Sequence, residues 1–312
     1  MKHNIDIIQQ GIIAPASANA LFITLNKLTA SADVNAVKQA ISELPAQLAK
    51  MQTAFEDAGL LLTIGLSSSY WDSLELAQKP EKLQPFQTIS NAQVTMPATD
   101  ADMLLHIRSA RHDVNYHLAL ELCELLKAYL HVDEMVHGFK YMDSRDFTGF
   151  VDGTENPEGE SRQAVALVND DQHFNGGSYI HIQKYHHDLA AWKKIALKQQ
   201  EDSYGRTKKD NDEYAGTDKL NSAHTKRASV KDSAANSIEI LRHSLPFGNL
   251  KHSGLLFASY AASPDNFNLM LQSMCNIDEH GDADKILHIT SAVTGDAFFA
   301  PNLAWFESLA KS

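Results

Sequence analysis

Short hydrophobic runs and helically spaced apolar residues alternate along the first half of the chain. Runs rich in β-branched and aromatic residues at 20–26, 60–66, 103–109 and 134–141 predict strands. Between them, apolar residues recur at helical spacing over 33–57 and 116–130. Pro45 lies inside the first of these segments and is expected to kink or split its helix. The first half therefore reads strand, helix, strand, strand, helix, strand.

The second half repeats this order loosely. Strands are predicted at 177–185, 238–244 and 254–259, and helices at 189–198, 267–275 and 284–293, with a polar insert at 199–237. The order βαββαβ is that of a ferredoxin-like module. We therefore predict an α+β fold in which two such modules, with antiparallel sheets, pack into one compact unit. The N-terminal module is expected at 1–145 and the C-terminal module, which carries the insert, at 146–312.

Composition and charge exclude several classes of protein. The chain has 312 residues, of which 44% are hydrophobic and 21% charged, as in ordinary soluble domains. Its net charge of −12 argues against binding to nucleic acid or to anionic membranes, and favours neutral or cationic small substrates. No apolar run reaches the length of a membrane span, and residues 1–15 lack a signal-peptide core, so the expected location is the cytoplasm.

The two cysteines carry little functional signal. Cys123 and Cys275 are far apart, and each lies in an apolar, helix-like run. We expect both to be buried free thiols. Because no CxxC pair occurs, a zinc ribbon and covalent attachment of a cofactor through paired cysteines are both disfavoured.

The segment 146–157, with the sequence DFTGFVDGTENP, concentrates glycine, acidic and amide residues. Gly149 and Gly153 permit backbone angles and close approaches that other residues resist. Between them lies Asp152, followed by the short hydrogen-bonding side chains of Thr154 and Asn156. Taken alone, the segment is equally typical of an Asx turn or a helix cap.

Three segments resemble the dye-decolourising peroxidases. GFVDGTENP at 149–157 is similar to the GxxDG signature of that family, ILRHSLPFG at 240–248 to its distal-arginine strand, and TSAVTGDAFFAP at 290–301 to its C-terminal segment. They occur in the family's order, and the resemblance covers nearly the whole chain. It implies a peroxidase with a non-covalent haem b in the C-terminal half. Its substrates would be hydrogen peroxide and a small one-electron donor such as a dye or a phenol.

The iron ligand cannot be chosen by composition, because the chain has fifteen histidines. The resemblance assigns this role to His224, in NSAHTKR at 221–227. Arg227 is then a candidate partner for the haem propionates, since a guanidinium matches a carboxylate, whereas Lys226 is closer to a solvated charge. Asp284 could accept a hydrogen bond from the second ring nitrogen of His224, or could instead be a charge at a helix start. The other expected cofactor contacts are Gly153, Thr154 and Asn156.

For the chemistry, the resemblance designates Asp152 as the base that moves a proton between the oxygens of peroxide. Arg242 would stabilise the negative charge that builds during O–O cleavage, and Ser244, two residues further along the same predicted strand, could position peroxide or a water. We expect the cation of Arg242 to lower the pKa of Asp152, and therefore expect an acidic activity optimum.

Two other functions are compatible with the same residues. The chain could be a haem-handling protein that recovers iron, or a haem-free protein whose cleft binds a small organic ligand. Trp71, Trp192 and Trp305 are candidate electron relays, although each is also a typical core residue. A homo-oligomer, a dimer or larger, is expected from the resemblance. Loading into an encapsulin shell is not expected, because no extended tail follows the FFAP segment.

Overall fold

The structure is a computed structural model that describes residues 7–28 and 32–311. The N-terminal stretch considered above therefore lies partly outside the described residues. In the first half, all four predicted strands are present: β1 (Asn19–Lys27), β2 (Leu61–Ser67), β5 (Met103–Ser109) and β6 (Leu130–Phe139). The segment 33–57 is split into α2 (Val34–Ser42) and α3 (Leu44–Ala54), because Pro45 occupies the first turn of α3. The next helix, α5 (His112–Leu126), begins before its predicted start.

The second half departs further from its prediction. Its strands are β7 (Ser178–His187), β8 (Leu241–Arg242), β9 (Leu245–Gly248), β10 (Ser253–Ala261), β11 (Thr290–Ala292) and β12 (Asp296–Ala300). Its main helices are α6 (Ser161–Ala166), α7 (Leu189–Trp192), α8 (Leu197–Tyr204), α9 (His224–Ala228) and α10 (Pro264–Cys275). The predicted helix at 284–293 is wrong: a short 3₁₀ helix, η3 (Lys285–His288), is followed directly by β11.

Shorter elements connect these. They are α1 (Gln10–Ile13), η2 (Glu56–Ala58), α4 (Ser68–Ser73), β3 (Ile89–Ser90), β4 (Thr95–Met96) and α11 (Leu303–Leu309). The small β3–β4 hairpin forms a sheet of its own.

Apart from β3 and β4, the described strands of the two halves form one continuous antiparallel sheet. Its order is β11-β7-β12-β2-β5-β1-β6-β9-β10-β8, and β7 also pairs with β10. This additional pairing closes the strands from β7 through β12, β2, β5, β1, β6 and β9 to β10 into a ring. The predicted α+β class with antiparallel pairing is confirmed, but the halves share hydrogen bonds at β12–β2 and β6–β9 instead of only packing together.

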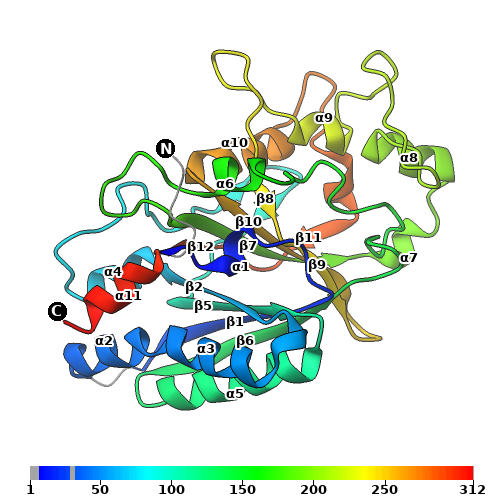
Figure 1. Ribbon diagram of the computed structural model, residues 1–312. Coiled ribbons are helices and arrows are strands. Elements are labelled where there is room, and N and C mark those ends of the chain that lie inside the picture. Colours follow the sequence, from blue (N-terminus) through cyan, green and yellow to red (C-terminus); the bar gives the residue numbers. More distant parts are fainter. Residues whose placement is uncertain (1–6, 29–31, 312) are drawn as a thin grey trace.

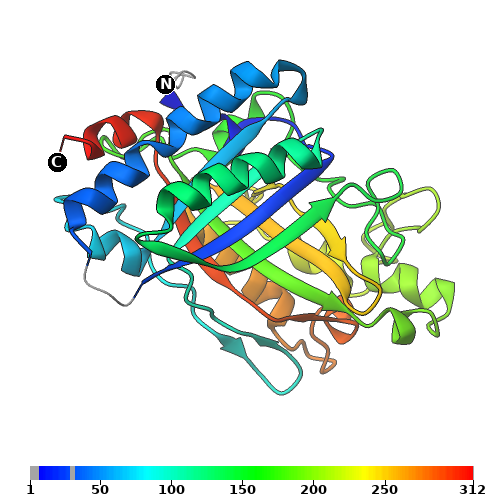
Figure 2. The same cartoon turned by 90° about the horizontal axis from the view of Figure 1, so that it is seen from below.

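Helices cover the ring of strands on opposite sides. In Figures 1 and 2, α2, α3 and α5 lie against the strands of the first half, while α8, α9 and α10 lie beyond those of the second half. The first group buries an apolar core that includes Leu21, Ile64, Leu105 and Leu118. On the other side, α10 contacts β7, β10 and α9, so that an apolar space is enclosed between sheet and helices.

Within the residues 7–28 and 32–311, no helix combines the length and the apolar character that a bilayer span requires.

Candidate functional site

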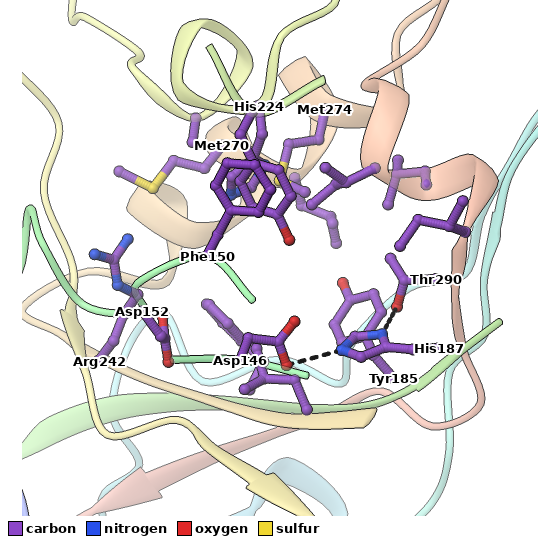
Figure 3. Close-up of a pocket in the computed structure, with 18 of the residues that line it drawn as sticks. Asp146, Phe150, Asp152, Tyr185, His187, His224, Arg242, Met270, Met274 and Thr290 are labelled. Carbon is purple, nitrogen blue, oxygen red and sulfur yellow. Dashed lines mark hydrogen bonds and ion pairs between the residues drawn. The ribbon is translucent and has the colours of Figure 1, made fainter. Parts of the chain in front are cut away.

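A mostly apolar cavity lies between β7, β10 and the helices α9 and α10. Its walls are built from aliphatic, aromatic and methionine side chains, among them Leu255, Phe257, Leu271, Leu287, Ile289, Met270 and Met274. Figure 3 shows His224 on one side of this space and Asp152, Asp146 and His187 on the other. A second, more polar cavity adjoins it, and His224, Asp152 and Arg242 belong to the walls of both. The site is therefore an apolar slot with polar groups at its edges.

His224 is held by Asp284. The imidazole Nδ1 lies 2.8 Å from Oδ2 of Asp284, a carboxylate that is fully buried. Asp284 also caps η3, because its Oδ1 accepts a hydrogen bond from the backbone N–H of Ile286 at 3.1 Å. The two alternatives considered for Asp284 thus coexist in one side chain. Since a carboxylate accepts, Nδ1 of His224 must donate, which leaves a lone pair on Nε2.

The free edge of the His224 ring faces the cavity. Its side chain is 29% exposed, and no described residue forms a hydrogen bond with Nε2. The local chain explains this orientation: α9 begins at His224, and the carbonyl of Ser222 accepts a hydrogen bond from the N–H of Lys285 at 2.9 Å. This backbone contact joins the loop before α9 to the start of η3, and so brings His224 and Asp284 together.

Arg242 is positioned by Asn156. The Asn156 side chain accepts from the N–H of Arg242 at 2.8 Å and donates to its carbonyl at 2.9 Å, which fixes the backbone of the short strand β8. The guanidinium itself forms no hydrogen bond with any described residue, and its Nε is buried without a partner. Gly153, with φ of +79°, turns the chain between Asp152 and Asn156. The segment 149–157 therefore supplies the carboxylate of Asp152 and, through Asn156, also holds the backbone of Arg242.

The pKa of Asp152 does not follow the expectation from its sequence context. Burial of the carboxyl raises the pKa above its ordinary value, and the negative charge of Asp146 acts in the same direction. Arg242 lowers the pKa, as expected, but its effect is smaller than that of burial. The expected effect of Arg242 is therefore present, but burial outweighs it and the net shift of the pKa is upward.

A buried hydrogen-bond network borders the cavity and was not anticipated from the sequence. Asp146 accepts hydrogen bonds from the hydroxyl of Thr148 at 2.9 Å and lies 3.1 Å from Nε2 of His187, whose Nδ1 is 2.8 Å from Thr290 (Figure 3). Since the Thr148 proton goes to Asp146, the Tyr204 hydroxyl donates to Thr148, at 3.0 Å.

This network keeps Asp146 ionised. Burial would raise its pKa, but the hydrogen bonds from His187 and Thr148 outweigh burial, so that the pKa lies below its ordinary value. The Tyr204 ring lies 6.0 Å from that of His224, and burial raises the Tyr204 pKa, so the phenol stays protonated. Asp146 and Thr148 belong to the segment DFTGFVDG, but His187 and Tyr204 carried no sequence signal, because they come from distant elements.

Other predicted site residues lie further from the apolar slot. The Ser244 hydroxyl accepts a hydrogen bond from the N–H of Ala258, and Ser244 lines a neighbouring cavity that also contains Arg242. Thr154 is exposed at the edge of the polar cavity, where its hydroxyl accepts from Asn211. Of the three tryptophans, Trp192 packs near Tyr204, whereas Trp71 of α4 and Trp305 of α11 pack against each other.

Arg227 requires a correction. Its guanidinium forms an ion pair with Asp278 at 3.0 Å and donates to the carbonyls of Ser273 and Asp282. It lines neither of the two cavities, since α9 directs it toward the end of α10 instead. The predicted pairing with a cofactor carboxylate therefore has no support, and Lys226 is an exposed side chain bonded to Asn221, as expected.

These residues fit a flat, largely apolar cofactor with a metal at its centre. The apolar slot can exclude water from such a group, and His224 offers a ring-nitrogen lone pair that a metal could take. The carboxylate of Asp284 supplies the outer contact that orients metal-bound imidazoles. Three or more metal-binding side chains do not cluster anywhere in the described residues, so a metal here would need further ligands from the cofactor itself.

Comparison with known proteins gives a consistent result. The family model described as "Dyp-type peroxidase, N-terminal" matches residues 9–140, and "Dyp-type peroxidase, C-terminal" matches residues 143–305. The dye-decolorizing peroxidase of Mycobacterium tuberculosis is 33% identical over 302 residues, which cover 96% of this chain and 89% of that protein.

Solved structures agree with this similarity. A putative Dyp-type peroxidase from Shewanella oneidensis superposes with a TM-score of 0.92 at 40% identity, covering 98% of both chains. A variant of DypB from Rhodococcus jostii RHA1, solved in complex with heme, has a TM-score of 0.91 at 34% identity, covering 96% of this chain and 97% of that one.

Proposed function

The chain belongs to the Dyp-type peroxidase family and is a haem-dependent peroxidase; within that function, we propose that His224 binds the haem iron and that Asp152 and Arg242 act on hydrogen peroxide. One observation carries these roles. His224, oriented by Asp284, directs its free nitrogen into an apolar slot, and the opposite edge of that slot carries Asp152 and Arg242 (Figure 3). A haem peroxidase uses an imidazole to hold the metal, and a base with a cation to act on peroxide.

The roles follow from the chemistry of each group. Bound haem supplies the two electrons that cleavage of the O–O bond consumes, and regains them one at a time from the donor. Asp152, when ionised, accepts the proton from one oxygen of hydrogen peroxide and delivers it to the other oxygen, which leaves as water. Arg242 stabilises the negative charge that develops on the leaving oxygen. Asn156 fixes the backbone of Arg242, and the apolar walls exclude bulk water.

A spectroscopic titration tests the proposal. Purified protein mixed with hemin is expected to develop a Soret band, which shifts when one equivalent of hydrogen peroxide is added and returns when a phenolic donor follows. The measurement is an ultraviolet–visible spectrum at each step. A Soret band that only bleaches would favour haem handling, and protein that takes up no hemin would leave the family fold without its cofactor.

The raised pKa of Asp152 predicts a particular pH dependence. A base acts only when ionised, so kcat/KM for peroxide should rise with pH through the pKa of Asp152. That acid limb is expected above the value of about 3.9 that is typical of aspartate, because burial raises the pKa. Asp146→Asn removes a neighbouring negative charge and should move the limb to lower pH. The pH profile of kcat/KM measures both, and an unchanged limb in Asp152→Asn would contradict the assignment.

The two halves are proposed to be ferredoxin-like modules that meet near residue 145. The strand order β2-β5-β1-β6 in the first half and β12-β7-β10-β9 in the second support this, because each places the first strand between the third and fourth. The two family models also divide the chain between residues 140 and 143.

We also propose that the protein forms a homo-oligomer. Tyr116 and Leu120 on α5, and Val132 and Met135 on β6, are apolar side chains that are each more than 40% exposed. Such residues are enriched where subunits meet.

A further inference from the structure

A third cavity, of about 450 Å³, lies beside the peroxide site and has no assigned role. It is bordered by the segment 16–20, by the loop that carries Asp152 and by the start of β9. Asp152, Gly153 and Arg242 line both this cavity and the polar cavity next to His224, so the two spaces adjoin. Part of its wall is apolar or aromatic, including Leu245 and Tyr141. A molecule held there would therefore lie next to the groups that act on peroxide.

The charge of this cavity is opposite to that of the protein. The whole chain carries −12, yet the cavity walls contain two carboxylates, Asp152 and Glu158, against five cationic side chains: Arg108, Lys140, Arg145, Arg162 and Arg242. A cleft lined by one sign of charge concentrates ligands of the other sign. Locally, the site therefore favours anions, unlike the neutral or cationic substrates that the net charge suggested.

Within residues 7–28 and 32–311, none of these five cations forms an ion pair with a carboxylate. In the part of the chain that the structure describes, ion pairs of arginine with carboxylates occur at Arg111, Arg206 and Arg227, all outside this cavity. Arg108 donates instead to backbone carbonyls of the segment 11–15, and Arg145 to those of 149, 208 and 209.

Burial of an unpaired cation is unfavourable. Arg108 is only 2% exposed, and burial lowers its pKa to about 10. Arg162 is partly buried and donates to the carbonyl of Pro157 at 3.1 Å, again without a carboxylate. An anion in the cavity would supply the missing countercharge, and guanidinium groups are well matched to carboxylates.

The remaining walls add neutral polar groups. His106 and His243 line the cavity, and burial lowers the pKa of both, so they add no charge. Nε2 of His106 and Nδ1 of His243 have no hydrogen-bond partner among the described residues. The cavity thus combines unpaired cations, apolar surface and a volume suited to a small aromatic molecule.

From this we propose that the cavity binds a phenol carrying a carboxylate, and that this anionic phenol is an electron donor of the enzyme. The inference rests on the proposed function, because the donor must lie beside the peroxide site. Two phenol molecules each give up one electron and their hydroxyl proton, and these reduce one hydrogen peroxide to two waters. The carboxylate stays intact and serves only to bind.

The test compares two donors that differ in charge. The probes are 4-hydroxybenzoate and the uncharged 4-hydroxybenzamide, with the haem-loaded protein and peroxide. The native protein is expected to show the lower KM for the benzoate. In the double variant Lys140→Gln, Arg162→Gln, KM for the benzoate should rise about tenfold, as the loss of a charge-assisted contact predicts, while KM for the benzamide changes less than about twofold. Lys251→Gln, at an exposed lysine outside the cavity, is the matched control.

Binding is measured separately from turnover. Isothermal titration calorimetry measures the affinity of the protein for 4-hydroxybenzoate without peroxide, with and without haem. We expect the double variant to weaken this affinity about tenfold, as it raises KM. If the double variant fails to fold, Lys140→Gln alone replaces it, because the side chain of Lys140 is exposed and forms no hydrogen bond within the described residues, whereas the backbone N–H, which bonds to Ala18, is kept. The proposal is overturned if the native protein has equal KM values for the two phenols. It is also overturned if Lys251→Gln raises KM for 4-hydroxybenzoate as much as the double variant does. If 4-hydroxybenzoate binds but the haem-loaded protein shows no peroxidase turnover, the proposed function is refuted, while binding of an anion in this cavity stands.

Discussion

Replacement of Arg242 by leucine is expected to lower kcat/KM for hydrogen peroxide by about 10²–10³-fold while the protein retains haem. In the proposed mechanism the guanidinium stabilises the developing negative charge. It forms no hydrogen bond with any described residue, so its removal breaks no hydrogen bond of the side chain in that part of the chain. The backbone of β8 should stay in place, because Asn156 holds the N–H and carbonyl of residue 242 and not its side chain. Stopped-flow spectroscopy of the Soret band gives the rate constant.

The haem content of Arg242→Leu shows whether the variant has lost its reactivity with peroxide or its cofactor. It is measured on the same preparation as the absorbance of extracted haem per mole of protein. Arg111→Leu is the matched control, because Arg111 is an exposed arginine paired with Asp113 and remote from the cavities. If Arg242→Leu lost its haem instead of its rate, Arg242 would be a cofactor-binding residue, and the haem-handling alternative would gain.

The same variant should also change the pH profile. Arg242 lowers the pKa of Asp152, although burial has the larger, opposite effect. Without the cation, the acid limb of kcat/KM should move to higher pH, in the direction opposite to that expected for Asp146→Asn. Opposite shifts from the two variants would identify Asp152 as the group that titrates, since general disruption of the site would move both in the same way.

Sequence patterns predicted the elements of the first half well, because each strand there is a short run of β-branched or aromatic residues. The run at 103–109 coincides with β5, and Pro45 marks the break between α2 and α3. The pattern failed at 284–293, where apolar residues at helical spacing are shared between η3 and β11. There, pairing of β11 with β7 overrides the local preference, and such long-range pairing leaves no periodic signal.

The candidate site, like the fold, could be predicted from the sequence only in part. Asp152 and Asn156 lie within one short segment, so a motif could bring them forward together. The contact of His224 with Asp284 spans 60 residues, and that of His187 with Asp146 spans 41. Only the fold brings these partners together. Arg227 shows the reverse case: its residue type suited a carboxylate partner, and the structure supplies one, Asp278, at a different place.

His224→Ala is expected to have the largest effect on the cofactor. The alanine variant loses the one imidazole nitrogen that faces the slot without a hydrogen-bond partner among the described residues. Asp284→Asn keeps the imidazole but weakens its orientation and basicity, which typically costs about 10–100-fold in metal affinity or activity. We expect His224→Ala to exceed that loss. Titration with hemin, followed at the Soret band, gives both affinities, and added imidazole should partly restore the band in His224→Ala only.

A second histidine in the same cavity, His187, provides a control that distinguishes the loss of an iron ligand from the loss of side-chain volume. His187 also lines the slot, but Asp146 and Thr290 engage both of its ring nitrogens, so it has no lone pair available to a metal. His187→Ala should therefore bind hemin with nearly native affinity and show no rescue by imidazole. Equal losses in His187→Ala and His224→Ala would mean that the cavity responds to lost volume and not to a lost ligand. A graded loss, largest for His224, intermediate for Asp284 and small for His187, is the pattern expected if His224 binds the iron. His187 lines the same cavity but has both ring nitrogens engaged, and Asp284 contacts only the far nitrogen of His224.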